Sequence, residues 1–538
     1  MTAQGISRRE LVRRGGGLLA LPALVGGRAA AAATPATDAS VAPTAAGLRA
    51  GPDVYRSIGV RPFVNARGTY TILSGSTQLP ESRSAMEAAA RQYVHLDELA
   101  EAIGRRLAEL TRAEWGMVSS GCSAALTHAT AACVTGGNPD LHVRVPDLRG
   151  FQRDECIIPA HSRNVYDAAV RAVGVRVVEV STAEELEAAF GPRTALVYIL
   201  ADPKADEGPL STRAICALAR PRGVPVLVDA AAEILTIPNV HLGLGADLVA
   251  YSGGKCLRGP QAAGLLLGRK DLVKAAWVGS APHHGFARGF KVGKEEAVAM
   301  LAAVEAWVRR DYEAEIRLWA SWLDTIARRL APIAGVTTSV TLATGLSNRM
   351  PLLQVRWDKA KLRTSGDAVA RLLFDGEPRI SLFPARGKLD DGETGLTIGP
   401  YMMAPGDEKV VAERLFAVLS KPQPVAEKPL APAAADLTGT WDVRIQYAAG
   451  ATTHQLHLRQ RGNEVDGTHQ GDFLSRDLRG TIDASEVRLR SSYDHGDSLN
   501  YTFTGTVAGD EMGGELDLGE YLSARWTARR HAGRRPER

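Results

Sequence analysis

Cysteine is scarce in this chain, with 5 residues among 538. An odd number of thiols without Cys-x-x-Cys spacing excludes a disulfide scaffold and argues against a zinc site, so no metal site is predicted. Long apolar runs are also missing near the start of the chain. The run from Leu18 to Val25 is well short of the ~20 residues that a membrane span needs. We therefore expect no membrane span in the mature protein.

A strong charge of one sign is missing too, because 64 Lys and Arg stand against 60 Asp and Glu. The small excess lies at the ends: residues 1–33 and residues 529–538 each hold five Arg and one Glu. The remaining body has 54 bases and 58 acids. Nucleic-acid binders usually carry a basic face, so no nucleic-acid partner is expected. What is present is a globular composition, 45% hydrophobic and 23% charged, long enough for two or three domains.

Residues 1–33 have the order of an export signal peptide. Paired Arg8 and Arg9 precede the apolar run, and alanines up to Ala33 follow it. The arginine pair is typical of twin-arginine signals, which direct the export of folded proteins. We therefore expect a periplasmic or secreted protein. The alternative, an amphipathic or anchoring helix, is disfavoured by three consecutive glycines and a proline.

Strands and helices alternate between residues 54 and 419, after an Ala/Pro/Thr-rich linker over 34–53. This alternation predicts an α/β fold with a mostly parallel sheet covered on both faces. We assign 54–294 to a large domain, and 295–419 to a connecting helix and a small α+β domain. The strands expected in the large domain are Trp115–Val118, Glu155–Pro159, Arg176–Val180, Ala195–Leu200, Pro225–Val228 and Leu248–Tyr251.

The C-terminal part changes from helical to strand-like patterning. A Pro/Ala-rich linker over 420–436 precedes about eight short alternating segments over 437–530, which are punctuated by glycine. This pattern predicts a small antiparallel barrel or sandwich, followed by a basic tail over 531–538. Two roles stay open for this module: stability or assembly, and the carriage of a ligand.

Two residues follow strands in a pattern that indicates chemistry. Lys255 ends a Ser-Gly-Gly-Lys turn after the strand 248–251, where its amine can reach a ligand crevice and form an imine. Asp229 follows the strand 225–228 and is expected at the same sheet edge. Pyridoxal phosphate enzymes need such a lysine and an acid beside the pyridine nitrogen. The sequence thus predicts pyridoxal 5'-phosphate with Lys255 and Asp229 as catalytic residues; the alternatives are a solvated loop lysine and a helix N-cap.

Further cofactor contacts are predicted at neighbouring strand ends. At Ser120–Ser123, free amides and hydroxyls at the start of a helix are expected to form a cradle for the cofactor phosphate. His161 could stack on the pyridine ring; the alternative is an ordinary loop histidine. Cys122 is read as part of this cradle and not as a nucleophile. The predicted cofactor-binding residues are Ser120, Gly121, Cys122, Ser123, His161, Asp229, Ser252 and Lys255.

Two arginines are candidates for binding a substrate anion. Arg163 lies two residues beyond His161, and Arg379 precedes an expected strand over Ile380–Phe383 in the small domain. A guanidinium can hold a carboxylate through two parallel hydrogen bonds. For Arg379, an exposed surface position is the open alternative.

Several blocks resemble the bacterial selenocysteine synthase-like family of pyridoxal phosphate enzymes, which includes L-seryl-tRNA(Sec) selenium transferase and D-glucosaminate-6-phosphate ammonia-lyase. The resemblance covers roughly residues 54–419. It implies a type I aminotransferase-like fold, Lys255 as the imine-forming lysine, and a homodimer or larger homo-oligomer. The blocks that carry it are Asn65–Tyr70, His95–Leu99, Ser252–Lys255, Gly259–Gln261 and Lys291–Glu295.

The expected function is a lyase that deprotonates Cα of a small-molecule amino substrate, an amino acid or amino sugar acid, and eliminates a β-substituent. A selenium transferase-like activity, an aminotransferase activity and a non-catalytic envelope-binding role on the same fold are the alternatives. The export-like N-terminus occupies the position where a tRNA-charging transferase would need an RNA-contacting domain. The C-terminal β module is not part of either the selenium transferase or the ammonia-lyase. The substrate therefore stays open.

Overall fold

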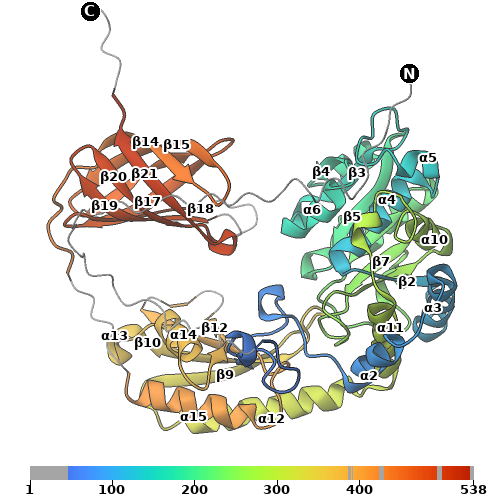
Figure 1. The fold of residues 1–538 in the computed structure, drawn as a ribbon, viewed down its shortest axis with the longest axis horizontal. Helices are drawn as coiled ribbons and strands as arrows, with labels where there is room; N and C mark the ends of the chain where they lie inside the picture. Colours follow the sequence, from blue (N-terminus) through green and yellow to red (C-terminus); the bar gives the residue numbers. More distant parts are fainter. Residues whose placement is uncertain (1–46, 386–388, 391, 423–428, 493–499, 533–538) are drawn as a thin grey trace, which may run out of the picture. The chain divides into compact units, whose positions relative to one another are not determined.

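The computed structural model describes residues 47–385, 389–390, 392–422, 429–492 and 500–532 (Figure 1). The expected signal peptide, most of the first linker, and parts of the second linker and of the basic tail lie outside these residues. The described residues up to Pro62 belong to one compact unit and those from Phe63 onward to another. The first unit contains the short helix η1 (Arg56–Ile58), which is held by a hydrogen bond from Ser57 Oγ to the Val54 carbonyl.

A seven-stranded sheet in the order β2-β8-β7-β6-β5-β3-β4 forms the centre of the large domain. Every pair is parallel except the two made by β8, so the predicted mostly parallel sheet is confirmed. The antiparallel strand β8 was not among the expected strands. The bounds are β2 (Trp115–Ser119), β3 (Glu155–Pro159), β4 (Arg176–Val180), β5 (Thr194–Leu200), β6 (Val226–Asp229), β7 (Leu248–Ser252) and β8 (Gly264–Gly268).

Successive strand residues face two different cores, one on each side of the sheet. Val197 packs with helices α3 (Leu96–Thr111), α8 (Thr212–Ala219) and α11 (Lys294–Arg309), whereas its neighbour Leu196 packs with α4 (Cys122–Thr135) and α10 (Lys270–Val278). This period of two is expected when both faces of a parallel sheet are buried. A further helix, α2 (Pro80–Ala89), packs on α11.

The small domain follows the long helix α12 (Tyr312–Leu330). Its four-stranded sheet has the order β12-β13-β10-β9, and α14 (Gly366–Asp375) and α15 (Asp407–Ser420) accompany it. The single strand expected over 380–383 is instead split, because β11 (Ile380–Ser381) pairs in parallel with β1 (Val64–Asn65) while β12 pairs with β13. The remaining bounds are β9 (Val336–Leu342), β10 (Pro351–Asp358), β12 (Phe383–Pro384) and β13 (Glu393–Ile398).

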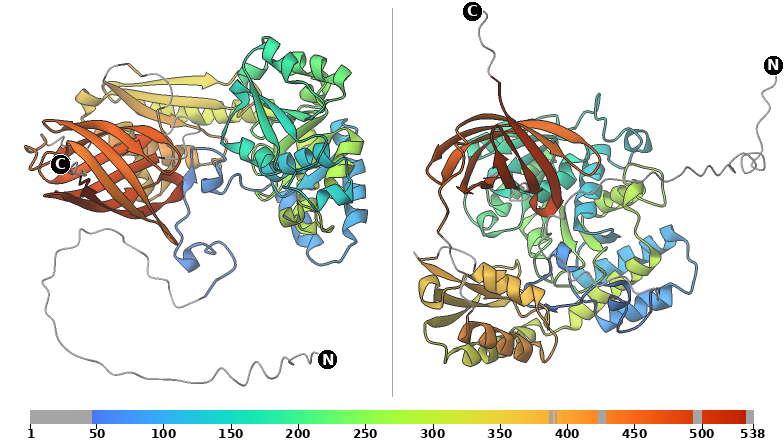
Figure 2. Two further views of the ribbon diagram at one scale, coloured as in Figure 1. Left: turned by 90° about the horizontal axis from the view of Figure 1, so that it is seen from above. Right: turned by 60° about the vertical axis from the view of Figure 1, so that its left-hand side comes forward.

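The C-terminal strands close into an antiparallel barrel of eight strands (Figure 2). Each strand pairs with the next, and β21 pairs back with β14, so no strand edge is left open. Trp441, Phe503 and Trp526 are buried in its interior. The strands are β14 (Gly439–Gln446), β15 (Ala451–Arg461), β16 (Glu464–Gln470), β17 (Ser475–Asp483), β18 (Glu486–Ser492), β19 (Asn500–Ala508), β20 (Glu511–Asp517) and β21 (Ser523–Arg530).

The cysteines are all buried, and none is in a disulfide. Within the ranges given above, no helix has both the length and the apolar character needed to cross a bilayer. The same ranges hold no group of three or more His, Cys, Asp or Glu side chains that could bind a metal ion.

Removal of an interior side chain should destabilise the barrel. Trp441 is 0% exposed and donates its Nε1–H to the Leu437 carbonyl, so Trp441→Ala should lower the free energy of unfolding by about 3–5 kcal/mol. Urea denaturation of the full chain, followed by near-UV circular dichroism, measures this change. Phe473→Ala is the matched control, because this ring is 94% exposed and its loss should cost less than about 0.5 kcal/mol. Equal effects of the two substitutions would contradict the packing described.

Candidate active site

The carboxyl ends of the parallel strands bring the predicted residues to one edge of the sheet. Ser119, the last residue of β2, and Ser252, the last residue of β7, both lie opposite Gly264 of β8. Asp229 at the end of β6 lies opposite Ala250 of β7. The helix-start segment after β2, the lysine turn after β7 and the aspartate therefore converge, as expected for a ligand crevice of such a sheet.

Lys255 stands in the turn that follows β7, where it is half-buried. The turn is tightly packed, since a Cβ on Gly253 would lie 2.5 Å from Met300 Sδ and one on Gly254 would lie 2.7 Å from Gln261 Cα. The backbone amide of Arg258 donates to the Lys255 carbonyl at 3.0 Å. The glycines thus allow close packing of the turn against Met300 and Gln261, which fixes the backbone position of Lys255.

Asp229 is buried at the end of β6 with 2% exposure. Its Oδ2 accepts a hydrogen bond from the Tyr198 hydroxyl at 3.0 Å. Its Oδ1 accepts from the Ala231 amide at 3.1 Å and from the Cys122 thiol at 3.6 Å. These three donors hold the carboxylate in one orientation.

The electrostatics of Asp229 indicate a missing cation. Burial raises the pKa of this carboxyl above its ordinary value, while the hydrogen bonds and the charge of Lys255 act to lower the pKa. Across the part of the chain that the structure describes, no Lys, Arg or His forms an ion pair with Asp229. A buried carboxylate without such a partner fits the protonated ring nitrogen of pyridoxal phosphate.

Tyr198 is a site residue that the sequence analysis missed. It lies within the apolar strand β5, is 0% exposed, and donates to Asp229. Its hydroxyl in turn accepts a hydrogen bond from Asn164 Nδ2 at 3.2 Å. The signal in the sequence is one hydroxyl group, that of Tyr198, within the apolar run Ala195–Leu200.

The segment between β2 and α4 has the form predicted for a phosphate cradle. Gly121 has a φ of 92° and leads into α4, whose first amides have no carbonyl partner within the helix. Gly264 of β8 lies directly beneath it, because a Cβ there would come 2.5 Å from the Gly121 carbonyl carbon and 2.7 Å from Cys122 N. Ser120 and Ser123 flank this backbone. Burial and the Asp229 carboxylate raise the pKa of the Cys122 thiol, which keeps it protonated.

His161 lies in the short helix η3 (Ala160–Ser162) after β3. Its Nε2 is buried and has no hydrogen-bond partner in the described structure. Burial lowers its pKa, so the neutral ring is favoured. A neutral, partly buried imidazole at this edge fits the predicted ring-stacking role, which stays a prediction.

The two arginines predicted to bind a substrate anion are engaged elsewhere. Arg163 forms ion pairs with Asp167 and Glu179, each at 2.6 Å, so a substrate would have to displace one of these acids. Arg379 donates its Nε–H to the Phe374 carbonyl at 2.9 Å and lies over that ring. The geometry does not favour Arg163, and the role of Arg379 stays a prediction.

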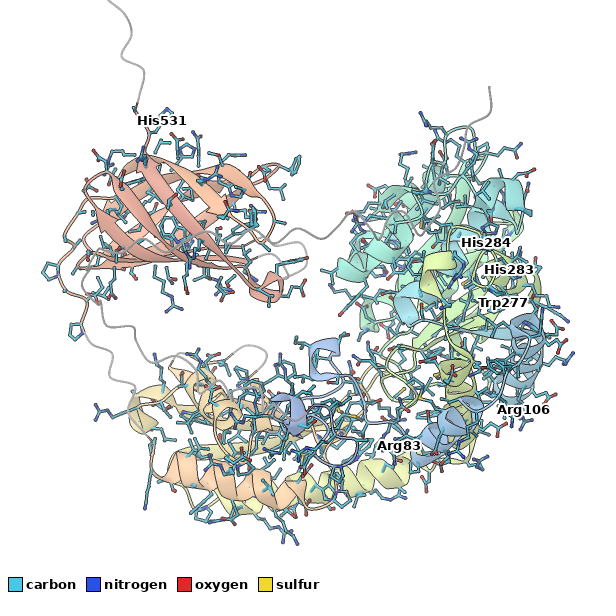
Figure 3. The ribbon with its side chains drawn as sticks, viewed as in Figure 1. Arg83, Arg106, Trp277, His283, His284 and His531 are labelled. Atoms are coloured by element: carbon cyan, nitrogen blue, oxygen red, sulfur yellow. The ribbon has the colours of Figure 1, made fainter. Side chains whose placement is uncertain are left out.

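Other blocks of the family resemblance fix the frame around the site. Asp97 of α3 accepts a hydrogen bond from Trp277 Nε1 at 2.8 Å and lies 3.2 Å from His283 Nε2, and the rings of Trp277 and His283 lie edge to face. Figure 3 labels both ring residues. Ser120 Oγ donates to the Phe290 carbonyl, just before the Lys291–Glu295 block. The contacts of Asp97 connect α3 to α10, and the contact of Ser120 connects the cradle to the segment before α11.

The hydrogen bond from Tyr198 should tune the Asp229 carboxyl. Because this bond lowers the pKa of Asp229, Tyr198→Phe should raise it, so that the carboxylate is lost at a higher pH. The acidic side of the pH profile of cofactor affinity should therefore move up by about 1 to 2 pH units. Dissociation constants of pyridoxal phosphate measured between pH 5 and 9 test this.

Tyr251→Phe is the matched control for this experiment. Tyr251 is also a buried tyrosine, but its hydroxyl accepts from Asn239 and makes no contact with Asp229. An unchanged profile in Tyr198→Phe, or equal shifts in both variants, would show that the hydrogen bond has no such effect.

Comparison with known proteins agrees with this geometry. The family Aminotransferase class-V matches residues 157–283, which include Asp229 and Lys255. The D-glucosaminate-6-phosphate ammonia lyase of Salmonella typhimurium is 28% identical over 373 residues, covering 68% of this chain and 97% of the relative. The 5'-C-glycyluridine monooxygenase-decarboxylase of a Streptomyces species is 33% identical over 380 residues, covering 68% and 92%.

A selenium transferase and a solved structure extend the comparison. The L-seryl-tRNA(Sec) selenium transferase of Moorella thermoacetica is 28% identical over 284 residues, 47% of this chain and 57% of the relative. A solved D-glucosaminate-6-phosphate ammonia-lyase aligns with a TM-score of 0.61 at 28% identity over 68% of this chain and 98% of its own. The chain therefore belongs to the selenocysteine synthase-like family of pyridoxal phosphate-dependent enzymes with the type I aminotransferase-like fold.

Proposed function

We propose that this enzyme is a lyase that removes the Cα proton and a β-substituent from an amino acid or amino sugar acid. The observation that carries the proposal is the buried Asp229 carboxylate next to Lys255 at the edge where the phosphate cradle also lies. The coverage of nearly the whole D-glucosaminate-6-phosphate ammonia lyase supports the elimination chemistry.

The roles of the residues follow from their positions. When bound, pyridoxal phosphate supplies an electron sink that stabilises negative charge at the substrate Cα. Asp229 would hold the protonated ring nitrogen, and Tyr198 and Cys122 orient that carboxylate. The first amides of α4 bind the phosphate. Lys255 would hold the cofactor through its Nζ, and the same amine would accept the Cα proton of the substrate.

The overall reaction balances without an oxidant. The substrate loses a proton from Cα and the β-substituent leaves with its bonding pair. The resulting enamine takes up a proton at Cβ, and water hydrolyses the imine to a keto acid and ammonia. Lys255 can give its proton to Cβ of the enamine, so one group serves as base and then as acid.

A second candidate is oxidative decarboxylation. It is favoured by one observation: the Streptomyces monooxygenase-decarboxylase has a higher identity, 33%, than the ammonia lyase, 28%. That chemistry needs dioxygen and releases carbon dioxide. Both candidates use the same Lys255 and Asp229, so the products and not the site residues separate them.

We also propose that the protein is exported in folded form and acts as a homo-oligomer. The support for export is the pair Arg8 and Arg9 with the apolar run and the alanines after it. A pyridoxal phosphate enzyme acquires its cofactor where the cofactor is made, which favours folding before export. The five thiols without a disulfide suit that order of events. An exported enzyme would not charge a tRNA, which argues against the selenium transferase alternative.

Lys255→Ala should remove both the visible absorbance of the cofactor-loaded protein and its turnover, the latter by about 10²–10⁴-fold through the loss of the base. Absorbance spectra after reconstitution with pyridoxal phosphate measure the first effect. Lys409→Ala, at an exposed position of α15, is the control and should match the wild type. A coloured Lys255→Ala protein would remove the lysine from its assigned role, and a colourless wild type would favour the non-catalytic envelope-binding alternative.

Product analysis distinguishes the reactions. A panel of β-hydroxy amino acids and amino sugar acids, including D-glucosaminate 6-phosphate, should give equal amounts of keto acid and ammonia under nitrogen and under air. No amino acceptor should be needed. A strict need for an acceptor would establish aminotransfer, and turnover only in air with release of carbon dioxide would establish the oxidative candidate.

Replacement of Arg8 and Arg9 by two lysines should trap the precursor inside the cell, because the signal pathway reads the arginine pair and not only its charge. Fractionation followed by immunoblotting measures the location. Replacement of Arg13 and Arg14 by two lysines is the charge-matched control and should leave export unchanged. Export of the Arg8-Arg9 variant at the wild-type level would reject this signal.

A further inference from the structure

A second hollow lies at the opposite edge of the large sheet. Its volume is about 400 Å³, within the usual range of small-ligand pockets. It is bordered by the end of α3, the end of α8 and the segments that enter β6 and β7. The side chains that matter for its chemistry are those of Arg112, Glu114, Cys216, Arg220, Asp247 and Arg269.

This hollow is separate from the site around Lys255. Asp247 directly precedes β7, whereas Lys255 follows it, and Val226 in the hollow is the first residue of β6, whereas Asp229 is its last. A strand of five residues is about 16 Å long. A ligand here would therefore not contact the catalytic residues.

The acidic groups of the hollow already have donors. Asp247 accepts from the Val226 amide at 2.9 Å and from Arg269 Nη1 at 2.9 Å. Glu114 accepts from the Lys270 amide at 3.1 Å. Arg269 is shared between Asp247 and Asp271. Asp247 is thus neutralised by Arg269, whereas Glu114 accepts only a backbone amide and has no ion pair within the described residues.

Two guanidinium groups in the hollow are left without an acid. In the described chain, neither Arg112 nor Arg220 has a side-chain hydrogen bond or an ion pair. Arg220 reaches over Gly245, where a Cβ would lie 3.2 Å from its Nη2. Gly245 has a φ of 108°, so the backbone both needs glycine and leaves room for the guanidinium there. Both arginines are exposed, so an anion can approach them from the solvent, and it would be attracted by both charges.

We propose that this hollow is a binding site for a small anion that carries phosphate or carboxylate groups, held by Arg112 and Arg220. Guanidinium groups bind both kinds of anion through paired, charge-assisted hydrogen bonds. The hollow has room for an organic acid or a phosphate ester, not only for a single inorganic ion. The site is independent of the proposed elimination reaction.

Calorimetric titration of the cofactor-loaded protein tests the site. Loading fills the phosphate cradle at α4, so that inorganic phosphate reports on the second hollow. Inorganic phosphate and citrate are titrated separately in a low-salt buffer. We expect saturable binding of at least one of them, weakened 10-fold or more by Arg112→Gln and by Arg220→Gln. Arg213→Gln is the matched control, because Arg213 is exposed on α8, which ends just before Arg220, and does not border the hollow.

Hydrogen exchange locates the bound anion. The anion that binds should slow amide exchange over residues 220–226 and 242–247 in the wild type, and not in Arg220→Gln. Binding of phosphate alone identifies a phosphate site, and binding of citrate alone identifies a carboxylate site. Absence of saturable binding, an affinity unchanged in both arginine variants, or an equal loss in Arg213→Gln would overturn the proposal.

Discussion

The burial of one carboxylate governs the arrangement of the active site. Asp229 is 2% exposed, and withdrawing an ionised carboxylate from water costs several kcal/mol unless donors and a cation compensate. The fold provides the donors, namely Tyr198, the Ala231 amide and the Cys122 thiol. The cation is left to the ring nitrogen of pyridoxal phosphate. A buried carboxylate that is oriented by these donors binds a protonated pyridine ring strongly and helps to keep the ring protonated. The ring withdraws electrons from the substrate only in this protonated form.

A second constraint comes from the antiparallel strand β8. Its first residue, Gly264, lies between the ends of β2 and β7 and so couples the phosphate cradle to the lysine turn. Any side chain at this position would collide with the backbone at Gly121. The distance between the cradle and Lys255 is therefore set by main-chain packing, which is more rigid than a set of side-chain contacts. In the proposed function, one stiff part of the sheet supplies both the phosphate contacts and the lysine contact of the cofactor.

Much of this site could be predicted from the sequence because of a simple rule. Lys255, Asp229 and the Ser120–Ser123 segment each follow an apolar strand, and the carboxyl ends of parallel strands meet at one edge. Tyr198 was missed because it lies inside a strand, and only the twist and register of the sheet show that its hydroxyl reaches the end of β6. The ion pair of Arg163 with Glu179 joins residues of different elements, so no local pattern in the sequence shows that this predicted substrate binder is already paired. In the barrel, the alternating segments indicated strands, but closure depends on the pairing of β14 with β21 across the whole module.

The central claim is that Lys255 is the residue that carries the cofactor, and chemical trapping tests it most directly. Borohydride reduction of the loaded protein makes the bond between the lysine Nζ and the cofactor permanent, and peptide mass spectrometry then locates it. The account predicts the cofactor mass on the peptide that contains Lys255 and on no other lysine. An adduct at a different lysine, or no adduct in a protein that binds the cofactor, would contradict the account.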